Sequence, residues 1–272
     1  MDIIKPVSES LSSIINNPVV LIPIGVYYVA VAVILGLLML LVPGFWLAKA
    51  FFHIGKISAA SLSTTGPTLL ALFLIVAIFV FYIPSVLLNG IFIGMGEQLY
   101  SNSKVDIDTA YKAAAKKYIE LFFAGIIFAA LAITIIIGFG GATFLIIKDM
   151  ISLWPVAVIT TIAMVLLFAI CIVYFFLINA AIIIGDNKLE PGIKQSFSIA
   201  RAHGLEIFLT LLLMVIIFTV VDVGAAIIAL IPVIGGVIYF IVSMFLATWF
   251  GILPVFVYHD LNQTKKRKPT KR

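Results

Sequence analysis

Residues 106–139 read DIDTAYKAAAKKYIELFFAGIIFAALAITIIIGF, a short amphipathic segment followed directly by a long apolar one. The first part carries Ile107, Tyr111 and Ala114 at the spacing of one helical face. Asp106 or Asp108 stands where a helix N-cap is expected. The second part is long enough to cross the hydrocarbon core as a helix, which takes about 20 apolar residues. The stretch therefore predicts a helix at the membrane surface that leads into a membrane span.

The whole chain has the composition of a membrane protein. Of its 272 residues, 64% are apolar and 11% are charged, whereas soluble domains are about 45–50% apolar and about 25% charged. Its one cysteine, Cys171, lies in an apolar run and excludes an intrachain disulfide or a site with several cysteine ligands. We therefore expect an all-α, polytopic membrane protein.

Six stretches are apolar and long enough to cross a bilayer. They are residues 18–42, 67–95, 118–139, 155–184, 205–231 and 233–258. Two further apolar segments, 43–67 and 144–154, contain aromatic residues, which favour the membrane interface. These two segments are either interfacial connectors or re-entrant helices.

One unit, an amphipathic helix followed by a pair of spans, recurs three times. The units cover about 6–97, 106–186 and 193–260 and form a single transmembrane domain, 1–260. The other two amphipathic helices have the same apolar spacing, at Val7, Leu11 and Ile14 and at Ile193, Phe197 and Ala200. Each unit closes on an acidic residue, and these three acids are Glu97, Asp186 and Asp260. Because every unit enters from the same side, we expect three parallel hairpin repeats, unlike the inverted pairs of many transporters.

Basic residues set the expected orientation of these hairpins. The side that holds both termini and the loops 96–117 and 185–204 carries 14 of the 17 Lys and Arg residues. The opposite side carries only Lys49, Lys56 and Lys148. We therefore expect a multi-pass protein of the cell membrane with both termini in the cytoplasm.

Several basic side chains on that side are expected to meet anionic lipid head groups. They lie on the amphipathic helices and in the tail, 261–272, and comprise Lys112, Lys116, Lys117, Lys194, Arg201, Lys265, Lys266, Arg267 and Lys268. A basic run beside a span is attracted to an anionic leaflet by about 1 kcal/mol per charge. Charge alone also fits nucleic acid, but no aromatic or folded segment accompanies the run. We expect a lipid bilayer as partner and no nucleic acid.

Carboxylates are the sharpest candidates for chemistry. Asp222 lies well inside the fifth predicted span, where a charge costs about 2.5 kcal/mol or more, and Thr219 shares its helical face. Asp222 marks either an ion or proton path or a structural polar contact, inside the bundle or between copies of the chain. Glu97, Asp186 and Asp260 form either an inner acidic ring for cations or ordinary polar helix ends.

Two pairs of residues inside the spans are also singled out. Asn89 and Asn179 each lie about seven residues before the acidic end of a span. They line a solute path as a symmetric pair or make ordinary interhelical hydrogen bonds. Gly90 and Gly94 form a G-x-x-x-G pattern, which is typical of close helix packing.

Residues 194–204, KQSFSIARAHG, stand between an acid-terminated span and a new span. This arrangement resembles the membrane domain attached to some glycerophosphoryl diester phosphodiesterases and related uncharacterised six-span prokaryotic membrane proteins. The resemblance covers about residues 6–260 and implies a fold without an established activity. The catalytic domain of those phosphodiesterases, with its His-Arg-Gly opening and metal-binding acids, is absent from this sequence.

Two functions fit these patterns. In the first, the protein passes an ion or small solute, or regulates its passage, along Asp222, Thr219, Asn89 and Asn179. In the alternative, it is a non-enzymatic membrane scaffold or lipid-contacting module that acts through partners. No Walker loop, nucleophile elbow or acid–base pair occurs in the sequence, and its three histidines lack zinc-site spacing. We therefore expect no enzyme, metal or cofactor, with a membrane enzyme as the weakest alternative.

Overall fold

The computed structural model describes residues 3–41, 81–140, 154–231 and 234–267, and every regular element in these ranges is helical. The all-α prediction is therefore confirmed for this part of the chain. The apolar segments predicted at 43–67 and 144–154 lie outside it, except for Trp154 at the start of a helix.

The elements follow the order expected from the sequence. They are α1 (Ile4–Asn16), η1 (a 3₁₀ turn, Pro18–Leu21), α2 (Ile22–Leu41), α5 (Ile83–Tyr100), α6 (Ile107–Lys116), α7 (Tyr118–Ile135), η5 (a π-helical turn, Ile136–Gly140), α9 (Trp154–Phe175), α10 (Ile178–Ile183), α11 (Leu189–Ile228) and α12 (Ile234–Arg267). The first two predicted amphipathic helices are α1 and α6, and the third forms the first part of α11.

Four helices in the described ranges are long and apolar enough to cross a membrane: Tyr118–Phe139, Val158–Ile183, Leu189–Ile228 and Ile234–Asn262. A fifth is present if Ile4–Asn16 and Pro18–Ile34, which meet at 93°, form one broken span. The most apolar stretches of the first three helices are only 17%, 22% and 17% buried, whereas that of the fourth is 56% buried. The length and composition of these helices make the chain a membrane protein, and the count of six spans stays a prediction.

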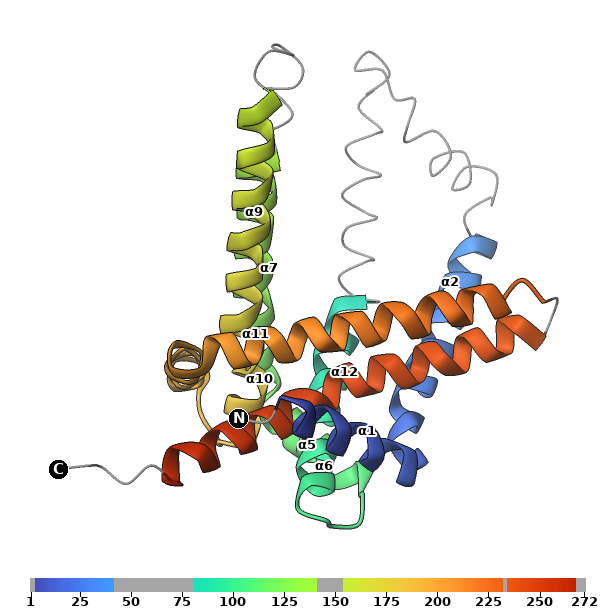
Figure 1. Ribbon diagram of the computed structural model, residues 1–272. Coiled ribbons are helices and arrows are strands. Elements are labelled where there is room, and N and C mark those ends of the chain that lie inside the picture. The colour runs from blue at the N-terminus through green and yellow to red at the C-terminus, as the bar shows by residue number, and fades with distance from the viewer. Residues whose placement is uncertain (1–2, 42–80, 141–153, 232–233, 268–272) are drawn as a thin grey trace.

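The well-packed part of the molecule, which we call the base, consists of α1, α5, α6, α10, the first part of α11 and the C-terminal half of α12 (Figure 1). Its largest buried side chain is Trp249 of α12, which is 1% exposed. The indole Nε1 of Trp249 donates to the hydroxyl of Ser10, 3.0 Å away, and that hydroxyl donates to the carbonyl of Val7. Because both polar groups are satisfied inside the core, α1 is fixed against α12 rather than lying free at a surface.

Small residues set the contact between α5 and α6. A Cβ placed on Gly94 would come within 3.0 Å of the Cα of Ala110, and one on Gly90 within 2.7 Å of the Cβ of Ala114. Gly90 and Gly94 therefore pack directly against two buried alanines. Tyr111 is 47% exposed, so the buried face of α6 differs from the predicted stripe, because this close approach has room only for alanine.

The two pairs of long helices leave the base in different directions. Figure 1 shows α7 and α9 side by side, and α11 and α12 side by side and running across that direction. His203 interrupts α11 with non-helical backbone angles, φ −135° and ψ 25°. This kink separates the amphipathic first part of α11 from its long apolar second part.

Candidate functional site

A chain of polar contacts crosses the base and joins four elements that are distant in sequence. Its centre is the loop between α10 and α11, where Asp186 adopts a left-handed backbone conformation with φ 47°. Aspartate and asparagine tolerate this conformation better than most residues, and it is common where a helix ends. Asn187 follows, and its side-chain amide donates to the carbonyl of Ala181, 2.9 Å away, which satisfies one of the last carbonyls of α10.

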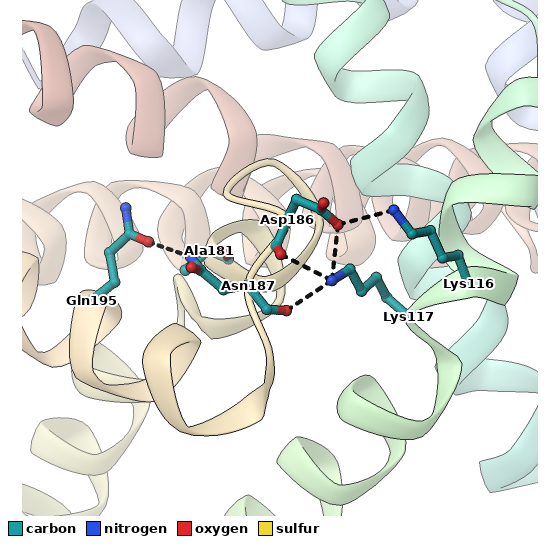
Figure 2. A network of polar contacts seen from close by, with 6 residues as sticks. All are labelled: Lys116, Lys117, Ala181, Asp186, Asn187 and Gln195. Carbon is teal, nitrogen blue, oxygen red and sulfur yellow. Dashed lines mark hydrogen bonds and ion pairs between the residues drawn. The ribbon is translucent and has the colours of Figure 1, made fainter.

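Lys117 holds this loop from the junction of α6 and α7 (Figure 2). Its side chain is 10% exposed, and its ammonium lies 2.8 Å from the Asp186 carboxylate. The same ammonium donates to the carbonyls of Asp186 and Asn187, at 3.0 and 3.1 Å. Lys116 approaches the carboxylate from solvent at 3.2 Å. Hydrogen bonds from Lys117, and then from Lys116, hold the pKa of the Asp186 carboxyl below its ordinary value.

The contacts continue from this loop to α12. The side-chain amide of Asn187 also donates to Oε1 of Gln195, 2.6 Å away, and Nε2 of Gln195 donates to the hydroxyl of Tyr258 at 2.6 Å. Beside Tyr258, Nε2 of His259 lies 2.5 Å from the Glu97 carboxylate of α5. The His259 ring also stacks on Tyr100, with the ring centroids 4.3 Å apart.

Glu97 and Asp186, two of the acidic residues predicted at the inner ends of the spans, pair with basic or imidazole side chains. Asp186 pairs with Lys116 and Lys117, and Glu97 pairs with His259. The third acid, Asp260, is half-buried in α12 next to that histidine. Glu97 and Asp186 therefore take part in contacts that hold the base together.

The four residues predicted to line a route are divided between the base and a span. Asn89 of α5 and Asn179 of α10 are half-buried in the base. Thr219 of α11 is exposed and donates back to the carbonyl of Val215, and Asp222 is half-exposed. At the rise of an α-helix, about 28 Å of α11 separates Asp222 from the kink at His203. None of the four residues lines either of the two cavities described below.

The basic residues predicted at lipid head groups fall into two classes. Lys112 pairs with Asp108, Lys194 with Glu190, and Lys116 and Lys117 with Asp186. Arg201 has no carboxylate partner among the described residues, and its side chain is exposed. Of the tail residues, Lys265, Lys266 and Arg267 belong to the last turns of α12, and Lys268 lies outside the described residues.

Two cavities accompany these contacts. One, of about 610 Å³, lies between α9 and the kink of α11 and is lined by Val173, Arg201, His203 and Glu206, among others. The other, also of about 610 Å³, lies in the base between α1 and the end of α5, where Glu9 and Tyr100 are among its lining residues. No cluster of three or more histidine, cysteine or acidic side chains suited to a metal ion occurs within the described ranges.

Sequence reasoning missed Asn187, Gln195 and Tyr258. A local signal existed for the first, because Gly185-Asp186-Asn187 directly after an apolar run is typical of a helix C-terminus. No local signal existed for the other two, because Gln195 and Tyr258 are 63 residues apart.

Comparison with known proteins finds a family match over nearly the whole chain but indicates no activity. A family model described as a domain of unknown function (DUF7847) matches residues 1–259, nearly the whole chain. No curated protein and no solved structure matches it. The resemblance to the membrane domain of phosphodiesterases stays a prediction.

Proposed function

The chain belongs to the DUF7847 family, and from its geometry we propose that it is a non-enzymatic membrane scaffold that contacts lipid and acts through bound partners. The observation that carries this proposal is the contrast between the base and the long helices. In the base, polar contacts join the α6–α7 junction to the α10–α11 loop, that loop to the first part of α11, and α12 to both α11 and α5. Along α7, α9 and α11, large apolar side chains such as Ile133, Ile159 and Val220 are exposed. Lipid or a second copy of the chain would cover that apolar surface.

The proposed topology is six spans in three parallel hairpins, with the base and both termini in the cytoplasm and the protein in the cell membrane. The four helices that are long enough to span, and the fifth if α1 and α2 form a broken span, support this count. In Figure 1, α11 and α12 run across the direction of α7 and α9. Both pairs of helices can therefore cross one flat bilayer only if one pair reorients toward the direction of the other. The kink at His203 supplies a joint at which α11 can reorient relative to the base.

A second candidate function is passage of a proton or small cation, and Asp222 is the residue that favours it. Asp222 is half-exposed within an apolar helix and has no hydrogen-bond or ionic partner among the described residues. A carboxylate in that setting is expensive in a bilayer unless it is hydrated or protonated. Passage would require water to reach this position in the assembled protein.

Reconstitution of the full chain into liposomes separates the two functions. The scaffold proposal predicts no flux of protons, Na⁺ or K⁺ above that of protein-free liposomes, and stable retention of lipid after purification. Cation or proton flux that Asp222→Asn abolishes, in a variant with an unchanged helical content, would contradict the scaffold and support passage. Asp108→Asn is the matched control, since it removes an exposed carboxylate of α6 outside the spans.

A further inference from the structure

We propose that the cavity between α9 and the kink of α11 binds one anionic phospholipid, with its phosphate at Arg201 and an acyl chain along α9. The cavity of about 610 Å³ has the size of a small-ligand site. One wall is formed by Leu166, Ile170 and Val173 of a helix that is long and apolar enough to span a membrane. The opposite end is formed by Arg201, His203 and Glu206.

The chemistry of the polar end favours an anion. His203 Nδ1 lies 2.6 Å from the Glu206 carboxylate, so the imidazole N–H donates a hydrogen bond to one oxygen of that carboxylate. Arg201 is left as a guanidinium without a carboxylate partner in the described part of the chain, although its side chain is exposed. On α6 and α11, by contrast, Lys112 pairs with Asp108, Lys116 and Lys117 share Asp186, and Lys194 pairs with Glu190. A guanidinium binds the oxygens of a phosphate in a bidentate manner, which a lysine cannot do.

The position of the cavity fits a lipid better than a soluble phosphate. It lies where the amphipathic part of α11 meets its apolar part, which is the depth at which head group and acyl chain meet in a bilayer. Leu166 and Ile170 are exposed on the wall, and an acyl chain would cover them. A Cβ on Gly204 would lie 3.9 Å from the Val173 side chain, an ordinary van der Waals contact, so the kink of α11 lies directly beside α9 at this end of the cavity. A soluble phosphate would leave this apolar wall bare.

The test is native mass spectrometry of the purified full chain in detergent, titrated with phosphatidylglycerol or with phosphatidylcholine of the same acyl chains. We expect one phosphatidylglycerol to bind with an affinity about tenfold above that of phosphatidylcholine, in line with one charge-assisted contact. Arg201→Gln should remove most of that preference, and Arg201→Lys should restore part of it. Lys104→Gln should leave it unchanged, since Lys104 lies between α5 and α6 and does not line this cavity.

Filling the cavity tests the apolar wall. Ala169→Phe, which places a ring into the cavity, should weaken both lipids, whereas Val165→Phe, at an exposed position of α9 outside the cavity, should weaken neither. Excess glycerol 3-phosphate should fail to displace the bound lipid.

Three results would overturn the site: equal binding of the two lipids, an equal loss of preference in Lys104→Gln, or displacement by glycerol 3-phosphate. The lipid site rests on the proposed lipid-contacting function, but different results would contradict the site and the function. Retention of both lipids without preference would remove the site and leave the scaffold standing, whereas a chain that retains neither lipid would contradict the scaffold itself.

Discussion

Lys117 joins the α6–α7 junction to the α10–α11 loop through three contacts. Its nearly buried ammonium serves two backbone carbonyls and one carboxylate of the α10–α11 loop. Lys117→Met keeps the length of the side chain and leaves both carbonyls without this donor, which costs about 1–3 kcal/mol. We expect the free energy of unfolding in detergent, followed by tryptophan fluorescence, to fall by that amount.

Lys116→Met is the matched control, because it removes the neighbouring cation from the same carboxylate. The side chain of Lys116 is 68% exposed, and its ammonium bonds to the Asp186 carboxylate rather than to the loop carbonyls. Its loss should change the unfolding free energy much less than the loss of Lys117. Equal effects of the two variants would mean that the carbonyl contacts contribute nothing beyond the ion pair.

Asp186 makes the stability of the base depend on pH. Its folded pKa lies below the ordinary value of 3.8 because of Lys117 and Lys116. A depressed carboxyl pKa stabilises the folded state above the unfolded pKa, and that stabilisation is lost as the pH falls through the folded pKa. Wild type should therefore exceed Asp186→Asn in stability at about pH 6, and the difference should shrink below about pH 4. Unfolding curves at several pH values test this, and a difference independent of pH would contradict it.

Local chemistry at single residues was predictable, and long-range contacts were not. Asp106 or Asp108 was predicted to cap the helix, and the cap is Asp106, which accepts from the backbone N–H of Asp108 at 3.1 Å and from the Thr109 hydroxyl at 2.6 Å. All three groups lie within four consecutive residues, so the signal is in the local sequence. The partners of Glu97 and Gln195 come from α12, and only the packing of helices decides them.

At the scale of elements, the packing of α5 on α6 depends on two glycines. Gly94→Leu would drive a side chain into the backbone of Ala110, which stands 3.0 Å from a Cβ at this site. We expect a loss of about 1–3 kcal/mol, the usual cost of overpacking, or separation of the two helices. Thermal unfolding in detergent, monitored by size-exclusion chromatography, measures the loss.

Gly224→Leu is the control for this substitution. A Cβ on Gly224 of α11 has no neighbour within 4 Å among the described residues, so leucine should be accepted there. The variant should keep wild-type stability within experimental error. An equal loss in both variants would show that the change from glycine to leucine, and not the contact with Ala110, lowers stability.

The sequence predicted where helices lie better than which face they bury. The predicted span at 118–139 coincides with Tyr118–Phe139, because an apolar run ends sharply at Lys117. The buried face of α6 was off by one position, because alanines face the two glycines and Tyr111 turns outward. Helix length follows from local hydropathy, whereas the buried face depends on the shape of the neighbouring helix.

At the scale of the whole molecule, the base and the hairpins have different roles. The base fixes the elements through buried side chains and the polar contacts of Lys117, Asn187 and Gln195. The most apolar stretches of α7, α9 and α11 are only 17%, 22% and 17% buried, so these helices present apolar surface. The two hairpins run in different directions in Figure 1. The scaffold proposal therefore depends on whether α11 and α12 cross the same membrane as α7 and α9.

Labelling of single cysteines from each side of the membrane answers this question most directly. In a Cys171→Ala background, Gly138→Cys reports the far end of the α7–α9 hairpin, Gly236→Cys that of α11–α12, and Lys104→Cys the base. Our account predicts that an impermeant maleimide added outside intact cells labels the first two sites, and labels Lys104→Cys only after permeabilisation. Labelling of Gly236→Cys only after permeabilisation would contradict it, because α11 and α12 would then lie on the cytoplasmic side.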